Sequence, residues 1–391
     1  MYYSKMLIPT IRENPQEAEA ISHKLMLKAG LIRRLASGIY TFLPLGYKAL
    51  RNVERIIRQE MESKGALELF MSALIPKELL EESGRWEVFG PEMFRLKNRE
   101  ERDFCLGPTH EESFTVTARN EIKSAKNLPL TLYQIQTKFR DELRPRFGII
   151  RCREFMMKDA YSFDKDELGL DISYSAMYDA YTKIFKRCGL DIVIADADSG
   201  AMGGSGSQEF MVVNDIGEDE IVVCSSCGYA ANIEKAEAVT IKRDFNETPL
   251  EKELIHTPNA KTIDDLTSLF SCSSQQFAKS LVLIADSEPV MAVLRGDREL
   301  SLNKLASILG CSNLDMADEL TIKNLTKADV GFASPVGIKC KVICDNELMN
   351  MVNFITGANK TDYHYKNVNL SDFSSYEFHD IRLVTDNDLC P

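Results

Sequence analysis

Two strand-like runs joined by a short turn constrain the fold of this chain more than any other feature. The first run is TLYQIQTKF, residues 131–139, and the second is REFMMKDAYSF, residues 153–163. Pro145 and Gly148 in the segment between them are typical of a turn. The pattern predicts a long β-hairpin, in which the stretch 138–164 carries arginines at the base and at the tip.

The arginines of this stretch stand out because the chain as a whole is acidic. It has 47 Lys and Arg against 59 Asp and Glu, a net charge of −12. Such a charge argues against non-specific coating of nucleic acid, but it leaves room for a local basic site for RNA. Arginine presents a planar fork of donors that suits phosphate. The alternative is a solvated basic hairpin. The residues concerned are Arg140, Arg144, Arg146, Arg151 and Arg153.

Length and cysteine usage set broad limits. With 391 residues the chain exceeds what one hydrophobic core usually supports, which predicts two or more domains. No apolar run reaches about 18 residues and the N-terminus lacks the order of a signal peptide, so we expect no membrane partner. The 10 scattered cysteines are typical of a reducing compartment, which predicts a cytoplasmic protein.

The N-terminal part predicts helices that alternate with strands. Asn14 and Pro15 are a typical helix start, and Gly30 is a typical end. A second amphipathic helix is expected over residues 46–65 and a strand over residues 66–74. This order is compatible with an antiparallel sheet backed by helices, which is an α+β fold.

The segment GPTHEESF, residues 107–114, has two interpretations. Thr109, with Glu112 three residues later, matches a capping box at the start of a helix over residues 112–123. Alternatively, the hydroxyl, imidazole and carboxylates of this segment could bind an ammonium group. Spacing alone favours the cap.

At about residue 224 the pattern changes to a second, α/β module. Helices are expected at TIDDLTSLF and SLNKLASIL, and strands at SLVLIAD, PVMAVLR, VGFAS and KVICD. Cys224 and Cys227 have the spacing of zinc ligands, but one pair is half of a site. Cys390 could begin a second pair and complete a zinc knuckle. The alternative, which is preferred, is two reduced cysteines in a turn.

With these residues laid out, the chain resembles the prolyl-tRNA synthetases of bacterial type, a class II family, over essentially its whole length. FRDE at residues 139–142 is similar to the entry of class II motif 2, and Phe155 followed by Asp159 is similar to its exit. GPTHEE, MKDAYSF and GGSGSQEF are also similar to segments of this family. The resemblance implies an antiparallel class II catalytic domain over residues 1–223, and an inserted α/β editing domain over residues 224–391.

The resemblance implies ATP-dependent activation of proline and its transfer to tRNA(Pro) by a homodimer, with ATP and Mg²⁺. Arg140 would bridge the α-phosphate and the proline carboxylate and stabilise the transition state. Glu142 would accept from the adenine amino group, and Phe155 would stack on the adenine ring. Arg151 would bind the γ-phosphate.

For proline itself, the resemblance assigns the ammonium group to Thr109 and Glu111. Phe163, and with it the loop 203–207, would shape the pyrrolidine pocket. Arg140 would be shared with ATP.

The second module resembles the editing insertion of the family, which hydrolyses mischarged Ala-tRNA(Pro). Alanine is smaller than proline and enters a proline pocket without a clash, so binding alone discriminates weakly. The positions that match the editing site are Thr257, Lys279, Gly331, Asp345 and His364. Lys279 is the strongest candidate, because its cation could hold a tRNA phosphate or polarise the ester.

Three departures from the family pattern qualify these expectations. Ser72 stands where motif 1 normally has a proline, and Gln208 where many members have histidine. Neither the glycine-rich motif 3 with its arginine nor an anticodon-binding domain occurs in the sequence. We therefore expect a C-terminally incomplete synthetase that is weakly active or inactive alone. The alternatives are an editing-only deacylase and an inactive synthetase-like binding module.

Overall fold

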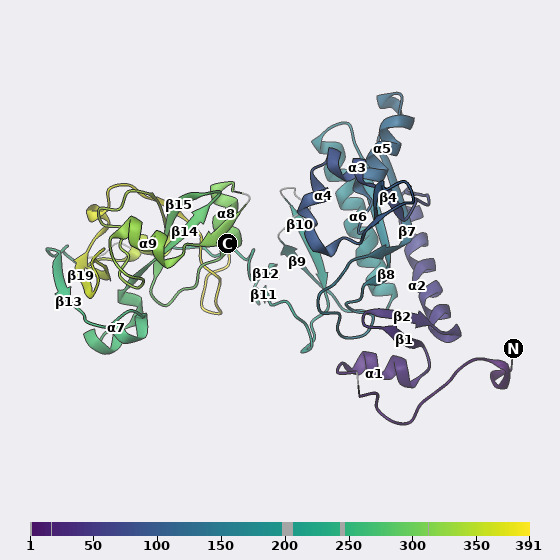
Figure 1. Ribbon diagram of the computed structural model, residues 1–391, viewed down its shortest axis with the longest axis horizontal. Coiled ribbons are helices and arrows are strands. Elements are labelled where there is room, and N and C mark those ends of the chain that lie inside the picture. Colours follow the sequence, from purple (N-terminus) through teal and green to yellow (C-terminus); the bar gives the residue numbers. More distant parts are fainter. Residues whose placement is uncertain (1, 17, 198–205, 243–246, 312) are drawn as a thin grey trace. The chain divides into compact units, whose positions relative to one another are not determined.

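The computed structural model describes residues 2–16, 18–197, 206–242, 247–311 and 313–391, which form two compact units (Figure 1). The first unit comprises residues 1–192 and 212–216, and the second comprises residues 193–211 and 217–391. Strands on both sides of position 223 belong to the second unit, and the domain boundary expected at that position remains a prediction. No helix in the described ranges is long and apolar enough to cross a membrane.

The first unit is built around the expected hairpin. Strand β7 (Leu130–Phe139) pairs antiparallel with β8 (Glu154–Phe163) along its whole length, and β3 (Leu67–Glu68) lies parallel to the other edge of β7. Two smaller antiparallel sheets accompany it. One contains β1 (Ile32–Ala36) and β2 (Ile39–Phe42), and the other has the order β4 (Leu74–Pro76), β6 (Asp103–Leu106), β5 (Arg95–Lys97). The predicted hairpin is confirmed.

Two long helices cover one face of this hairpin. They are α2 (Pro44–Ser63) and α6 (Glu167–Arg187), seen beside β7 and β8 in Figure 1. Tyr133 and Ile135 of β7 are buried against Met61 of α2 and Ala180 of α6. Because side chains alternate along a strand, the neighbouring residues of β7 face away from this apolar layer. The shorter helices are α1 (Ile21–Lys28), α3 (Lys77–Glu82), α4 (Arg85–Val88) and α5 (Glu111–Glu121).

For the first predicted helix, the C-terminal boundary agrees with the structure better than the N-terminal boundary does. The helix expected from Asn14 begins only at Ile21, although it ends near Gly30 as expected, where φ is +69°. The helix expected over residues 46–65 is α2, with Pro44 in its first turn. The strand expected over residues 66–74 is reduced to the two-residue β3 and the start of β4.

The described residues of the second unit form three sheets. A five-stranded sheet has the order β16 (Leu314–Met316), β14 (Ala278–Ala285), β15 (Glu288–Arg295), β17 (Lys341–Asp345), β20 (Glu377–His379). A three-stranded sheet joins β13 (Glu253–His256), β19 (Tyr363–Val368) and β18 (Phe354–Gly357). A four-stranded sheet has the order β10 (Ser207–Met211), β9 (Val193–Ala197), β12 (Ala230–Asn232), β11 (Ile221–Val223). The helices are α7 (Ile263–Phe270), α8 (Leu302–Leu309) and α9 (Glu319–Thr326).

The central strands β14 and β15 are buried on both faces. Val282 and Met291 pack into one apolar cluster, and Leu283 and Ala292 pack into another. This double burial explains their nearly continuous apolar sequences. The predictions for α7, α8, β14, β15 and β17 are confirmed. The predicted strand VGFAS is wrong, because residues 330–334 form a loop in which Gly331 adopts a φ of +102°. The α+β class is confirmed, with antiparallel pairing dominant throughout.

Candidate active sites

The face of the hairpin turned away from α2 and α6 is unusually polar for a buried surface, and we call it the polar face. Gln134, Gln136 and Lys138 lie at alternate positions of β7, and each is at most 5% exposed. Asp159 and Tyr161 of β8 share this face by the same alternation. A strand that buries three polar side chains in a row must give them partners, because unpaired buried polar groups are costly.

Asp159 is the centre of that pairing. Its two carboxylate oxygens accept from Lys138 Nζ at 2.8 Å, from Gln134 Nε2 at 2.9 Å and from the Tyr161 hydroxyl at 2.8 Å. Burial lowers the pKa of Lys138 and raises the pKa of Tyr161. The ion pair with Asp159 works against the effect of burial on Lys138.

Thr109 and Glu111 lie beside the polar face, and the capping-box prediction for Thr109 is wrong. Helix α5 follows His110 and has no side-chain cap. Thr109 is 5% exposed, and its hydroxyl lies 3.3 Å from the Tyr161 hydroxyl, which also accepts from the His110 backbone N–H at 3.1 Å. Glu111 forms an ion pair with Arg85 at 3.1 Å. The charge of Glu111 acts on both Lys138 and Tyr161. The interpretation as an ammonium site therefore remains.

The residues of the predicted motif 2 gather at the turn end of the hairpin. The guanidinium of Arg140 lies 5.7 Å from the centroid of the Phe155 ring. Among the described residues, Arg140 forms no ion pair. By contrast, Arg151 Nε donates to Glu142 at 2.9 Å, and Arg153 pairs with Asp141 at 3.2 Å.

Phe163 does not join this group. It pairs with Leu130 at the opposite end of the hairpin, eight residues along β8 from Phe155. At about 3.3 Å per residue, the two rings are separated by roughly 26 Å along the strand. In the loop expected to share the proline pocket, residues 203–205 lie outside the described residues.

In the second unit, a cavity of about 250 Å³ brings Lys279, Gly331 and His364 together, and we call it the histidine cavity. The hydroxyl of Thr257, which is fully buried, lies 2.7 Å from His364 Nδ1. Burial lowers the pKa of His364 to about 4, and a hydrogen bond to the Gly331 carbonyl opposes that shift. The ring is therefore neutral at pH 7. Apolar side chains form much of the wall: Ile263, Leu266, Phe277, Val282, Ile322 and Ile355.

Gly331 is fixed at this cavity by sterics. A Cβ there would lie 2.8 Å from Lys261 Cβ and 2.9 Å from the Lys261 carbonyl oxygen, and the positive φ would strain any other residue. The following turn is held by Asn359, whose side-chain amide donates to the carbonyls of Ser334 and Val336 at 3.0 Å. The turn that follows Gly331 is therefore held to the residues after β18.

Lys279 lies at the rim of the histidine cavity. Its Nζ is 2.8 Å from Glu299, a residue whose side chain is 76% exposed. An ion pair to so exposed a carboxylate contributes little and exchanges easily with another anion.

Two further residues of the histidine cavity were missed by the sequence. The hydroxyls of Ser280 and Thr356 are buried, line the cavity and have no hydrogen-bond partner within the described part of the chain. Their only sequence signal is a hydroxyl residue within an otherwise apolar buried strand. Since buried hydroxyls normally find partners, these two are available to a ligand.

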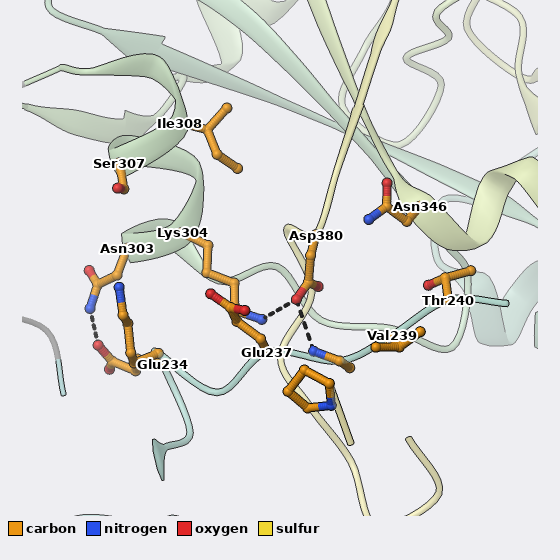
Figure 2. Close-up of a pocket in the computed structure, with 13 residues that line it drawn as sticks. Glu234, Glu237, Val239, Thr240, Asn303, Lys304, Ser307, Ile308, Asn346 and Asp380 are labelled. Carbon is orange, nitrogen blue, oxygen red and sulfur yellow. Dashed lines mark hydrogen bonds and ion pairs between the residues drawn. The ribbon is translucent and has the colours of Figure 1, made fainter. Parts of the chain in front are cut away.

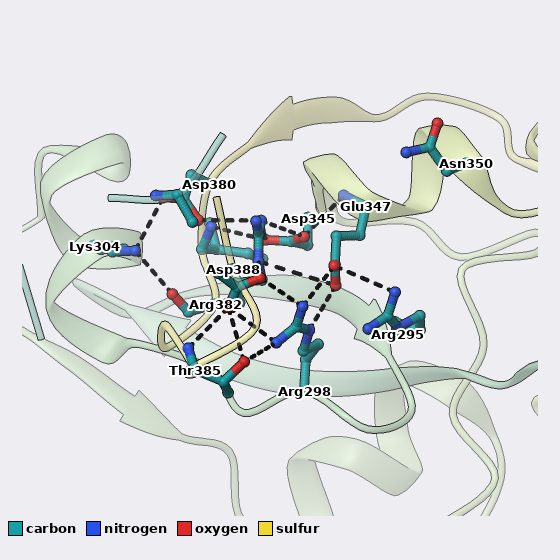
Figure 3. A network of polar contacts seen from close by, with 12 residues as sticks. Arg295, Arg298, Lys304, Asp345, Glu347, Asn350, Asp380, Arg382, Thr385 and Asp388 are labelled. Atoms are coloured by element: carbon teal, nitrogen blue, oxygen red, sulfur yellow. Dashed lines mark hydrogen bonds and ion pairs between the residues drawn. The ribbon is translucent and has the colours of Figure 1, made fainter. Parts of the chain in front are cut away.

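Asp345 is not brought to the histidine cavity. Its carboxylate, which is fully buried, accepts from Arg382 Nη1 at 3.1 Å and from the backbone N–H of Ile381 at 3.1 Å. Figure 3 shows it within a larger network in which Arg298 binds Glu347 at 2.7 Å and Asp388 at 2.6 Å. The structure therefore corrects the expectation for Asp345, which stabilises the junction of β17 with the C-terminal segment.

A cavity of about 490 Å³ elsewhere in the second unit holds none of the predicted site residues (Figure 2). Three of its charged groups already have partners, because Lys304 Nζ binds Asp380 at 3.0 Å, and Glu234 accepts from the amide of Asn303. The predicted pair Cys224 and Cys227 lies within the connection of β11 to β12. The sulfur of Cys390 lies within 4.8 Å of both.

The chain is similar to several known proteins. Residues 257–372 match the aminoacyl-tRNA editing domain family. The chain is 57% identical over 391 residues to a proline--tRNA ligase of Caldicellulosiruptor bescii, and covers 68% of that protein. It is 56% identical over 396 residues to a proline--tRNA ligase of a Thermoanaerobacter species, and covers 69% of that protein. In both comparisons all of the chain is matched. A prolyl-tRNA synthetase structure from Giardia lamblia with prolyl-adenylate gives 22% identity over 47% of this chain and 39% of that one, with a TM-score of 0.44.

Proposed function

This chain belongs to the family of proline--tRNA ligases, and we propose that the polar face of its first unit activates proline while the histidine cavity of its second unit hydrolyses mischarged tRNA. Proline--tRNA ligases are ATP-dependent enzymes whose substrates are proline, ATP and tRNA. Activation needs no covalent enzyme intermediate, because the proline carboxylate attacks the α-phosphorus of ATP directly. The work of the protein is to hold both reactants in line and to neutralise the charge that develops.

The observation that carries the first assignment is the state of Arg140. It lacks an ion pair among the described residues, whereas Arg151 and Arg153 are already paired with carboxylates. We assign Arg140 to the α-phosphate and the proline carboxylate. One such pair at 4 Å contributes roughly 4 kcal/mol at an effective dielectric constant of about 20, before desolvation. Phe155, directly beneath the guanidinium, offers its ring to adenine.

The remaining contacts to ATP are assigned by the same geometry. Glu142 would accept from the adenine amino group, which requires its present bond from Arg151 to be shared or released. Arg151 would then bind the γ-phosphate. Mg²⁺ would be held chiefly by phosphate oxygens and water, because the described residues bring no three carboxylate or imidazole groups together.

The proline ammonium is assigned to Thr109 and Glu111. The Thr109 hydroxyl is held against Tyr161, whose own proton is donated to Asp159. This chain of hydrogen bonds fixes the position of the Thr109 oxygen before proline arrives. Phe163 follows Tyr161 by two residues on the same face of β8, and we assign it to the wall of the pyrrolidine pocket.

In the histidine cavity the assignment rests on apolar walls and on a neutral imidazole. The apolar walls would admit the methyl side chain of an alanyl group. Lys279 at the rim would bind a phosphate of the tRNA end in place of the exposed Glu299. His364, neutral and oriented by Thr257, would bind the ester or its attacking water with the hydroxyls of Ser280 and Thr356.

Two paired measurements test this division of labour. Binding of a non-hydrolysable prolyl-adenylate analogue, followed by calorimetry, should weaken about 100-fold in Arg140→Ala, which corresponds to about 2.7 kcal/mol. Hydrolysis of Ala-tRNA(Pro) should fall about 100-fold in Lys279→Ala. Each variant should leave the other measurement unchanged.

Two exposed residues serve as matched controls. Arg144→Ala removes a cation from the same hairpin, and Lys339→Ala removes one from the second unit. Neither should affect its unit's measurement. If Arg144→Ala weakened analogue binding as strongly as Arg140→Ala, the assignment of Arg140 would be wrong.

A further inference from the structure

Three cysteines of the second unit converge although 163 residues separate the last from its nearer partner. The sulfur atoms of Cys224, Cys227 and Cys390 all lie within 4.8 Å of one another, and those of Cys227 and Cys390 are 3.5 Å apart. Among the described residues, no other group of three metal-ligating side chains comes together in this way. Neither proposed reaction uses these residues.

The segment that carries Cys224 and Cys227 already has the conformation of a metal knuckle. The Cys224 backbone N–H donates to the Tyr229 carbonyl at 2.8 Å, and the Gly228 N–H donates to the Cys224 carbonyl at 3.0 Å. Gly228 permits this tight turn with a φ of +79°. Backbone N–H groups also face the sulfurs: Tyr229 donates to Cys227 Sγ at 3.4 Å, and Ser226 donates to Cys224. Such bonds favour the thiolate, which is the form that binds metals.

Cys390 is held in place by packing that does not depend on the cysteines. The Val239 N–H donates to the carbonyl of Leu389, the residue before Cys390, at 3.0 Å. Val384 packs in a small apolar cluster with Ala231 of β12. The convergence of the three sulfurs therefore follows from the fold of this unit.

The sulfur spacing distinguishes a metal site from a disulfide. Tetrahedral zinc with Zn–S bonds of about 2.3 Å places its sulfurs about 3.8 Å apart, close to what is observed. A disulfide would require a separation of about 2.05 Å, which is shorter than the 3.5 Å between the sulfurs of Cys227 and Cys390. Three thiolates this close also repel one another unless a cation lies between them.

We propose that Cys224, Cys227 and Cys390 bind one Zn²⁺ ion, which ties the β11–β12 connection to the segment after β20. Zinc has a fourth tetrahedral position. Since no further ligand joins the group within the described part of the chain, water or an added thiol fills that position when the chain is studied alone. The site is structural, and its zinc stabilises the second unit against unfolding.

Metal analysis of the purified chain tests this directly. Prepared under reducing conditions without chelators, the chain should contain about one zinc ion, measured by plasma mass spectrometry. Cys224→Ser and Cys390→Ser should each lower the content at least about fivefold. Cys188→Ser and Cys272→Ser, which alter cysteines outside the cluster, should retain it.

Cobalt titration keeps the test independent of whether the variants fold. Co²⁺ added to the reduced, metal-free wild-type chain should produce thiolate-to-cobalt charge-transfer absorption and the intense visible bands of tetrahedral coordination, and Zn²⁺ should abolish both. A chelator should lower the thermal midpoint of the wild-type chain but not that of Cys390→Ser. The proposal is overturned if neither metal binds the reduced chain, if Cys390→Ser keeps its zinc, or if mass spectrometry finds only a Cys227–Cys390 disulfide.

Discussion

The polar face and the histidine cavity solve opposite physical problems. The polar face holds buried charge: Lys138 and Asp159 are both buried and bonded to each other, and Asp159 also accepts from Gln134 and Tyr161. The histidine cavity has mostly apolar walls and a neutral imidazole, and its only charged lining residues within the described chain are Lys261 and Lys279. The contrast matches the two reactions, since phosphoryl chemistry builds charge that must be met, whereas editing must first sort substrates by size.

The two sites also differ in whether their buried hydrogen-bonding groups have partners before a ligand binds. On the polar face the buried groups of Gln134, Lys138, Asp159 and Tyr161 bond to one another before any substrate arrives, so this part of the site is ordered in advance. Beside it, His110 Nδ1 and Glu111 Oε2 lack a hydrogen-bond partner within the described chain. In the histidine cavity, Ser280 and Thr356 lack partners within the described chain, so part of the hydrogen bonding must come from the ligand. We therefore expect substitutions to affect stability most on the polar face, and to affect activity without loss of stability at the two unpartnered hydroxyls.

The largest effect is expected from Asp159→Leu. It leaves the Lys138 ammonium, which is fully buried, without a counter-charge, and removal of one partner of a buried pair costs about 3–5 kcal/mol of unfolding free energy. Trp86 is the only tryptophan and lies in the first unit, so its fluorescence during urea unfolding reports on that unit alone. The midpoint should fall strongly.

A double variant separates the effect of the uncompensated charge from the effect of lost packing. In Lys138→Met/Asp159→Leu no ammonium is left uncompensated, so a large part of the lost stability should return. Arg119→Leu, which breaks the exposed pair with Glu82, should leave the midpoint nearly unchanged. If the double variant were no more stable than Asp159→Leu, the loss would come from packing, and the charge-based contrast between the two sites would fail.

An intermediate effect is expected from the titration of His364. Its pKa is about 4 in the folded chain and near 6.5 in the unfolded chain, so the unfolded state takes up the proton first as the pH falls. The contribution of this group is complete above about pH 6.5, is lost between about pH 6.5 and 4, and amounts to roughly 3 kcal/mol of unfolding free energy.

This loss can be measured in the second unit alone through Cys344. That thiol is fully buried, and burial raises its pKa to about 12, so alkylation in urea reports the unfolding of its surroundings. The acid-induced loss of stability should be smaller in His364→Asn by the amount given above. The exposed His379→Asn should keep the wild-type loss. Equal acid sensitivity in wild type and His364→Asn would show that the buried imidazole is not neutral.

The sequence predicted features that depend on local patterns. Alternation and turn residues predicted the hairpin, and apolar periodicity predicted α2, α7 and α8. The deciding interactions of these elements span a few residues, so a single sequence records them. Lys279, Gly331 and His364, by contrast, were brought into one hypothesis by the family resemblance and not by a local pattern, and the fold places them at one cavity.

The failures have distant causes. Thr109 is not a cap because its hydroxyl lies against Tyr161, 52 residues away. Asp345 is drawn from the histidine cavity by Arg382, 37 residues further along. VGFAS is a loop because Asn359 binds the carbonyls of the turn that follows it. Partners this remote leave no periodic signal in the sequence. The sequence pattern of a capping box or of an apolar run is the same whether or not such a partner exists.

The smallest and most discriminating effect is expected from Thr356→Val. The side chain is 2% exposed and its hydroxyl lacks a partner among the described residues, so replacing the hydroxyl with a methyl group should leave stability unchanged or raise it by up to about 1 kcal/mol. Thr326→Val is the matched control. That hydroxyl is equally buried but donates to the Ile322 carbonyl at 2.8 Å, so its loss should cost about 1–2 kcal/mol.

The two variants should rank in the opposite order for activity, with Thr356→Val more impaired than Thr326→Val. Hydrolysis of Ala-tRNA(Pro) should fall about tenfold or more in Thr356→Val, because the ligand loses a hydrogen bond inside a largely apolar cavity. It should be retained in Thr326→Val at temperatures where that variant stays folded, since Thr326 does not line the cavity. If Thr356→Val were destabilised like Thr326→Val and hydrolysed the ester normally, the hydroxyl would have a partner in the folded chain. The buried hydroxyl of Thr356 in the histidine cavity would then have a partner in the folded chain, as the groups bonded to Asp159 on the polar face do. The two sites would differ in charge alone.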